Sequence, residues 1–212
     1  MKLDSKQLLL YAVTDRSWTK NQSLYEQVEA SLKGGVTCVQ LREKEMNNEE
    51  FIKEALEIKD LCNKYHVPFI INDNLDVAIA TKAFGIHVGQ SDICVNNIRE
   101  LVGNDMIIGV SAQTKEQAIL AEQQKADYIG VGSIFTTTTK LDADSVSLET
   151  LKEICAATSI PVVAIGGINK SNIPLLVDTK IDGVALVSAI FASNDIEKET
   201  NELLQLIKNI VK

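Results

Sequence analysis

Polar side chains with the chemistry to bind an oxyanion come directly after one of the apolar runs of this sequence. Gln40, Arg42 and Lys44 occupy alternate positions there, so their side chains share one side of an extended chain. The Arg fork and the Lys point charge are well suited to phosphate. A surface ion-pair cluster with Glu43 and Glu45 is the alternative that these residue types leave open.

Two carboxylates occupy corresponding places after the next two apolar runs. Asp73 follows the run 67–72, and Asp92 follows the run 85–88. Neighbouring carboxylates repel each other unless a cation joins them, and hard oxygen ligands close to phosphate favour Mg²⁺. We therefore expect a Mg²⁺ site at Asp73 and Asp92, with helix capping by either residue or by Asn74 as the alternative.

Two later segments could bind phosphate through hydroxyl groups and backbone amides. The segment 133–140 holds four consecutive threonines before Lys140, and a surface loop without function is its alternative interpretation. Gly166-Gly167 and Val187-Ser188 follow the last two apolar runs. Glycines let backbone N–H groups approach a phosphate, and the start of a following helix adds its dipole. A second phosphate site is expected there.

The sequence offers no recognisable nucleophile or general base. It contains neither a Ser-His-Asp arrangement nor a metal-binding pair of histidines, and its two histidines are His66 and His87. His66 lies just after the end of an expected helix and His87 lies inside an apolar run, so a structural role is expected for both. Chemistry should then depend on positioning and on electrostatic stabilisation of a departing anion.

Short apolar runs alternate with amphipathic segments along the whole chain. The runs cover 8–14, 36–42, 67–72, 85–88, 106–111, 128–132, 161–165 and 183–188, and the helices are expected at 23–33, 48–64, 75–82, 96–101, 115–125, 148–157, 172–178 and 196–210. Runs that are apolar throughout are typical of parallel strands covered on both faces. The pattern predicts an α/β protein, a single-domain (β/α)8 TIM barrel over residues 1–212, with a doubly wound open sheet as the competing architecture. In the barrel, every polar segment above would leave the carboxyl end of a strand.

Composition excludes several classes of protein. With 45% hydrophobic and 24% charged residues, the chain can bury enough apolar surface to fold. Its net charge of −8 makes nucleic acid an unfavourable partner. Neither a membrane span nor a signal peptide is recognisable. The four cysteines, Cys38, Cys62, Cys94 and Cys155, form no CxxC pair, which favours reduced thiols in a cytoplasmic protein. A homo-oligomer is compatible with the sequence.

Taken together, these segments resemble the thiamine phosphate synthase family. The likeness runs nearly from end to end and falls in every expected strand–helix unit. The segments that carry it are Tyr11–Asp15, Val39–Lys44, Ile71–Asp73, Gly85–Asp92, Gly109–Ser111, Asp127–Gly132, Thr137–Lys140, Ala164–Ile168 and Val187–Ile190. No single motif is specific, but the set is.

The resemblance implies a transferase that joins two small molecules. Hydroxymethylpyrimidine pyrophosphate and hydroxyethylthiazole phosphate would give thiamine phosphate and pyrophosphate by dissociative substitution, with Mg²⁺ as cofactor. Asp73 and Asp92 would be the metal ligands, and Gln40 would lie near the pyrimidine. The implied pyrophosphate contacts are Arg42, Lys44, Asn72, Ser111 and Lys140, of which Arg42, Lys44, Ser111 and Lys140 would be catalytic. The implied contacts of the thiazole phosphate are Thr137, Thr139, Gly167, Val187 and Ser188.

Two other functions are compatible with a related barrel. A thiazole tautomerase-like isomerase would need a general base, and that branch typically has His in the sixth loop, where this chain has Ser133. A non-catalytic regulator that binds thiamine phosphate would be expected to lose the acidic or basic residues named above, all of which are present. The chain departs from the usual family pattern at Ser133 and Thr136, which replace prolines, and at Gln113, which replaces a frequent His.

Overall fold

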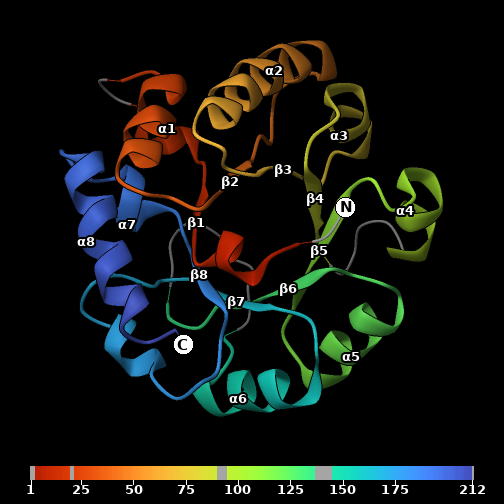
Figure 1. Ribbon diagram of the computed structural model, residues 1–212, viewed down its shortest axis with the longest axis vertical. Coiled ribbons are helices and arrows are strands. Elements are labelled where there is room, and N and C mark those ends of the chain that lie inside the picture. The colour runs from red at the N-terminus through yellow and green to blue at the C-terminus, as the bar shows by residue number, and fades with distance from the viewer. Residues whose placement is uncertain (1–2, 20–21, 90–94, 137–144, 212) are drawn as a thin grey trace.

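The predicted barrel is confirmed by the computed structural model, which describes residues 3–19, 22–89, 95–136 and 145–211. Eight parallel strands form a closed ring in chain order, and Leu10 of the first strand pairs with Val184 of the last (Figure 1). The strands are β1 (Leu10–Val13), β2 (Cys38–Leu41), β3 (Phe69–Asn72), β4 (Gly85–Val88), β5 (Ile107–Ala112), β6 (Tyr128–Val131), β7 (Val162–Ile165) and β8 (Gly183–Leu186).

Helices surround this ring of strands (Figure 1). They are α1 (Leu24–Lys33), α2 (Asn48–Lys64), α3 (Leu75–Thr81), α4 (Val95–Val102), α5 (Lys115–Gln123), α6 (Leu148–Ala157), α7 (Ser188–Phe191) and α8 (Ile196–Lys208), with 3-10 helices η1 (Ser5–Leu8), η2 (Arg16–Trp18) and η3 (Ile173–Leu176). Most of the longer helices begin after a side chain that accepts a backbone N–H of the first turn, as N-cap residues do. These caps are Ser23, Asn47, Asn74, Thr114, Ser147 and Asp195.

The helix expected at 172–178 is only the short η3. The side chain of Asn172, just before it, does not cap a helix, because its amide donates to the carbonyl of Gly167 at 2.9 Å and its oxygen accepts from the N–H of Asn169 at 2.8 Å. Val177, with φ −55° and ψ 143°, then leaves the helical conformation and ends the turn. The segment therefore stabilises the loop after β7 instead of forming a full helix.

Six of the expected strands are shorter than their apolar runs, and two of these runs also include part of a helix. The run that begins at Leu8 starts as the end of η1, and β1 begins at Leu10. The last run stops being a strand at Leu186, and Ser188 begins α7. The loop that links these two elements is therefore the single residue Val187.

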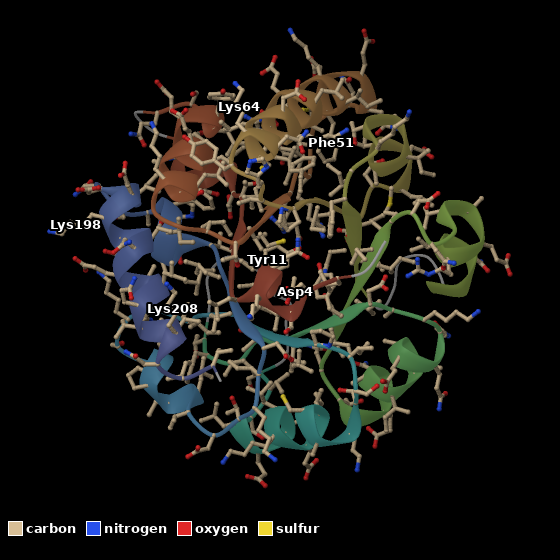
Figure 2. All side chains as sticks on the ribbon, in the orientation of Figure 1. Asp4, Tyr11, Phe51, Lys64, Lys198 and Lys208 are labelled. Carbon is tan, nitrogen blue, oxygen red and sulfur yellow. The ribbon has the colours of Figure 1, made fainter. Side chains whose placement is uncertain are left out.

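Apolar side chains form two separate layers. The outer layer packs the helices against the strands, for example Ile58 and Leu61 of α2 with Leu41 and Ile71. The inner layer fills the ring itself, as in other barrels of this type, and consists of Leu8, Tyr11, Val13, Cys38, Ile70, Ile107, Tyr128, Val163 and Ala185. Figure 1 shows η1 across the centre of the ring, and Figure 2 shows Tyr11 close to that centre. Since Leu8 of η1 belongs to the inner layer, η1 closes the amino-terminal end of the barrel.

A glycine in β5 makes room for the largest side chains of this interior. Gly109 pairs with His87 of β4 on one side and with Tyr128 of β6 on the other. A Cβ on Gly109 would overlap the ring of Tyr128, which is fully buried. The inner layer therefore depends on the absence of a side chain at this position.

No helix in the described ranges is long and apolar enough to cross a membrane. The three cysteines within these ranges, Cys38, Cys62 and Cys155, form no disulfide, and Cys94 lies outside them. Burial raises the pKa of Cys62 and of Cys155 to about 12, so both thiols are protonated at neutral pH.

Gly109→Ala should destabilise the protein by about 1–3 kcal/mol, because the new methyl group overpacks the barrel interior. The free energy of unfolding in urea measures this cost. In a Tyr128→Leu background, where the ring is missing, the same substitution should cost clearly less, as expected for residues in contact. An equal cost in both backgrounds would contradict the packing described here.

Candidate functional site

The carboxyl ends of all eight strands lie at one end of the barrel, here called the mouth. The ends of β1 and β2 are fastened together there by the buried Thr14. Its N–H donates to the carbonyl of Gln40 at 3.0 Å, and its hydroxyl oxygen accepts the N–H of Arg42 at 3.0 Å. This fixes the backbone from which Arg42 and Lys44 leave the strand. The Arg42 guanidinium forms no ion pair with a described residue.

The carboxylate between these two cations is paired with a different arginine. Glu43 accepts from Arg16 of η2 at 2.8 Å, and Arg16 also bonds Glu54 of α2. The Glu43 side chain is only 4% exposed, and burial raises the pKa of its carboxyl, although the hydrogen bond from Arg16 opposes this. Glu43 therefore anchors the loop after β2. It does not neutralise Arg42 or Lys44, whereas the alternative of a surface ion-pair cluster required that it would.

Asp73 lies beside Lys44 at the end of β3. The Lys44 ammonium is 3.4 Å from Asp73 Oδ2, and the amide of Asn72 donates to Asp73 Oδ1 at 3.1 Å. The N–H of Asp73 donates to the carbonyl of His87 at 2.8 Å, which ties the end of β3 to β4. Asp73 has a φ of 59°, a left-handed conformation that Asp adopts more easily than most residues. The mouth thus brings together three of the predicted side chains.

Asn74, and not Asp73, caps the helix that begins after β3. Asn74 Oδ1 accepts the N–H of Val77 at 3.0 Å, so Asn74 is the N-cap of α3. The Asp73 carboxylate is therefore not needed to begin α3. Helix capping, which was the alternative to a metal site at Asp73, is the role of Asn74.

The donor chemistry at Asp73 fits a Mg²⁺ ion. Its side chain is 35% exposed at the mouth and carries the hard oxygen ligands that Mg²⁺ prefers. Within the described ranges, no group of three or more His, Cys, Asp or Glu residues could hold a metal ion alone. Mg²⁺ usually binds through one or two carboxylates together with water and substrate phosphates. The second predicted ligand, Asp92, lies outside the described residues.

A row of hydrogen bonds crosses the barrel and ends at two of the predicted substrate contacts. Gln40 Nε2 donates to the Tyr11 hydroxyl at 2.8 Å, and this hydroxyl lies 2.8 Å from that of Tyr128. The Tyr128 hydroxyl is 2.9 Å from His87 Nδ1, and His87 Nε2 is 3.0 Å from Ser111 Oγ. Burial raises the pKa of Tyr11 and of Tyr128 well above the usual value, so both hydroxyls are neutral.

The ends of β7 and β8 place backbone amides on the opposite part of the ring from β3 and β4. Ile165 pairs with Ala185, so Gly167 and Val187 stand two residues beyond the same register position. Gly167 has a φ of 64°, and a Cβ there would come within 2.6 Å of the Phe135 carbonyl. Ser188 begins α7, whose first N–H groups have no partner within that helix. Backbone amides at this place in a barrel suit a phosphate group.

Four of the predicted site residues lie outside the described ranges, namely Asp92, Thr137, Thr139 and Lys140. The structure places the remaining ones at the carboxyl ends of strands or immediately after them. These are Gln40, Arg42, Lys44, Asn72, Asp73, Ser111, Gly167, Val187 and Ser188. The roles implied for all of them remain predictions.

Three residues of the site were given no role in binding or chemistry by the sequence. Tyr11 and Tyr128 lie in apolar runs, and His87 was expected to be structural; all three connect Gln40 to Ser111. The tyrosines in apolar runs could have indicated such contacts, because a buried tyrosine hydroxyl needs a hydrogen-bond partner. Its partner depends on the strand order and register, which a single sequence does not give.

Comparisons with known proteins find relatives along nearly the whole chain. A family model described as thiamine monophosphate synthase matches residues 10–190. A protein named thiamine-phosphate synthase from Clostridium tetani is 50% identical over 194 residues, which span 92% of this chain and 93% of that protein. One of the same name from Clostridioides difficile is 49% identical, over 93% of this chain and 94% of the other.

A solved structure extends the likeness to three dimensions. Thiamine phosphate pyrophosphorylase from Pyrococcus furiosus superposes with a TM-score of 0.91 and 36% identity, covering 98% of this chain and 99% of that one. The barrel is therefore shared over its full length.

Asn74→Ala should lower the free energy of unfolding by about 1 kcal/mol, because the first turn of α3 loses its cap. Asp73→Asn, one position earlier, should change it by less than about 0.5 kcal/mol, because Asn also tolerates the left-handed conformation. Urea titrations of both variants measure the difference. A larger loss for Asp73→Asn than for Asn74→Ala would contradict the assignment of the cap.

Proposed function

Since the chain belongs to the thiamine monophosphate synthase family, we propose that it transfers the hydroxymethylpyrimidine group from its pyrophosphate to the nitrogen of hydroxyethylthiazole phosphate. The products are thiamine phosphate and pyrophosphate. The observation that supports the proposal most is that two sets of groups suited to phosphate follow strand ends around one mouth. Cations and a carboxylate follow β2 and β3, and backbone amides follow β7 and β8. Both substrates carry phosphate, and each region suits one of them.

The first region binds the pyrophosphate that leaves. Arg42 and Lys44 face it as a guanidinium and an ammonium, and Asn72 and Ser111 supply hydrogen-bond donors from neighbouring strands. Lys140 belongs to the same group of contacts. Gln40, held by its bond to Tyr11, presents the rest of its amide to the pyrimidine. The second region, at Gly167, Val187 and Ser188 with Thr137 and Thr139, holds the thiazole phosphate.

Bond breaking precedes bond formation in this reaction. The bond between the pyrimidine methylene carbon and the pyrophosphate oxygen breaks, and its electron pair leaves with the pyrophosphate. The electron-rich aminopyrimidine stabilises the resulting carbocation. The thiazole nitrogen then donates its lone pair to the methylene carbon, which forms the new C–N bond and a thiazolium cation. The protein supplies no nucleophile; its cations stabilise charge that grows on the leaving group.

Asp73 and Asp92 are the residues that would hold Mg²⁺. When bound, the ion would neutralise negative charge on the pyrophosphate oxygens as they depart. The Asp73 carboxylate supports this role because it is partly exposed at the mouth and does not cap α3. Lys44, 3.4 Å from Asp73, would add its positive charge on the same side of the substrate.

The setting of the enzyme is part of the same proposal. Free cysteines in the described ranges support a reducing compartment such as the cytoplasm. The net charge of −8 supports small-molecule partners over nucleic acid. A homo-oligomer would leave the mouth complete, because every contact named above comes from one chain.

The direct test mixes the purified protein with both substrates and Mg²⁺. Thiamine phosphate and pyrophosphate should appear in equal amounts, and omission of either substrate should abolish both products. Tight binding of thiamine phosphate without turnover would instead favour a regulator, and conversion of a thiazole tautomer without pyrophosphate release would favour an isomerase. Either result would contradict the proposed function.

Arg42→Ala and Lys140→Ala should each lower turnover at least about tenfold, because each removes positive charge that the developing pyrophosphate needs. Steady-state kinetics with the pyrimidine substrate measures the loss. Lys33→Ala is the matched control, since Lys33 lies on α1 and pairs with Glu29 at 3.1 Å. Circular dichroism should show the same fold for all three variants. Full turnover in Arg42→Ala would remove Arg42 from the leaving-group site.

Excess EDTA should stop turnover, and added Mg²⁺ should restore it. Asp73→Asn should require a higher Mg²⁺ concentration for half-maximal rate, because one anionic ligand is lost. Initial rates across a Mg²⁺ titration measure this shift, with Asn74→Ala as the neighbouring control. Unchanged Mg²⁺ dependence in Asp73→Asn, or turnover that survives EDTA, would count against the metal site.

A further inference from the structure

Five polar residues from five strands form one continuous hydrogen-bonded row inside the barrel, here called the interior polar chain. In order, it consists of Gln40, Tyr11, Tyr128, His87 and Ser111, and each of its four contacts measures 2.8–3.0 Å. Its central tyrosines are buried, with 1% and 0% exposure. The two ends of the row are the residues placed near the pyrimidine and near the pyrophosphate.

Proton counting restricts how this row can be arranged. The Gln40 amide nitrogen can only donate, so the Tyr11 hydroxyl accepts from it. Tyr11 then has one proton to give, and if Tyr128 accepts it, Tyr128 donates its own proton to His87 Nδ1. An imidazole that accepts at Nδ1 carries its proton at Nε2. His87 consequently donates to Ser111, whose own proton is directed to an acceptor other than His87.

The opposite direction of the hydrogen bonds leaves the Tyr11 proton with only a weak acceptor. If Ser111 donated to His87 Nε2, the His87 Nδ1–H would donate to Tyr128 and Tyr128 would donate to Tyr11. The Tyr11 proton would then have to go to the neighbouring thiol of Cys38, and sulfur is a weak acceptor. Ser111 would also turn a lone pair towards an anionic substrate. In the first arrangement, the protons of Tyr11, Tyr128 and His87 each have an oxygen or nitrogen acceptor.

Two glycines hold the aromatic rings of the row in this register. Gly109 leaves space for the ring of Tyr128, as described above. A Cβ on Gly130 would lie only 3.0 Å from His87 Cε1, so the imidazole packs directly against the backbone of β6. The His87 ring is therefore confined between Tyr128, Ser111 and Gly130.

We propose that Tyr11 and Tyr128 are positioning residues that hold His87 in the Nε2–H form, so that Ser111 acts as a hydrogen-bond donor to the leaving pyrophosphate. The role of Ser111 in this proposal rests on the proposed function. The tautomer itself does not, because it follows from the hydrogen bonds of the protein alone. The row thus connects the pyrimidine end of the site to the leaving-group end through the barrel interior.

The test uses the intact protein labelled with ¹⁵N in its histidine rings, without substrate, at a pH of about 8.5, above the usual imidazole range. Since the chain has two histidines, exposed His66 is an internal control. Long-range ¹H–¹⁵N spectra should show His87 protonated at Nε2 and unprotonated at Nδ1. Protonation at Nδ1 in the wild-type protein would overturn the proposal.

Tyr128→Phe removes only the hydroxyl that fixes the tautomer. It should shift the His87 nitrogen signals towards a mixture of both tautomers and leave those of His66 unchanged. It should also lower kcat by at least about twofold, as an even mixture of tautomers implies, while KM for the thiazole phosphate is unchanged, because Ser111 is then positioned as a donor in only part of the protein. Unchanged His87 signals in Tyr128→Phe would overturn the role of Tyr128.

Tyr11→Phe and His66→Gln complete the series. Tyr11→Phe should have a smaller effect than Tyr128→Phe, because Tyr128 can still donate to His87; an effect as large as that of Tyr128→Phe would contradict the order of the row. His66→Gln should leave turnover unchanged. If the wild-type tautomer is as expected but no thiamine phosphate forms, the proposed function fails and the interior polar chain stands.

Discussion

Closure of the parallel sheet into a ring is the constraint on which the whole site depends. Because neighbouring strands all run the same way and β8 pairs with β1, every strand ends at the same mouth. Residues that are far apart in the chain, such as Arg42 and Ser188, are therefore carried to one end of the molecule. Short loops then keep them there: Thr14 ties β1 to β2, and Asp73 ties β3 to β4.

The second constraint is that side chains must fill the interior of the ring. Eight short strands enclose a space that side chains must occupy, and two buried tyrosines are among the side chains that fill it. Burial of their hydroxyls without partners would be costly. Hydrogen bonds to Gln40 and His87 satisfy them, and the same row includes Gln40 and Ser111, two of the predicted substrate contacts. The hydrogen bonds that satisfy the buried tyrosines therefore also orient Gln40 and Ser111.

The eightfold alternation of apolar runs and amphipathic segments, together with the family resemblance, predicted the barrel. The polar residues that follow the runs predicted the mouth. It could not assign the helix cap to Asn74 over Asp73, since the two are adjacent and of similar type. The pairing of Glu43 with Arg16 and the interior polar chain depend on strand register and contacts through space. The sequence likewise predicted a helix from Asn172, because it does not show that the Asn172 side chain bonds to the carbonyl of Gly167.

A crystal structure of the protein with thiamine phosphate, pyrophosphate and Mg²⁺ tests the central claim most directly, because electron density locates both phosphorylated groups at once. We expect pyrophosphate within hydrogen-bond distance of Arg42 and Ser111, Mg²⁺ between it and Asp73, and the thiazole phosphate against the amides of Gly167 and Ser188. Density for either group away from the carboxyl ends of the strands would contradict the site described here.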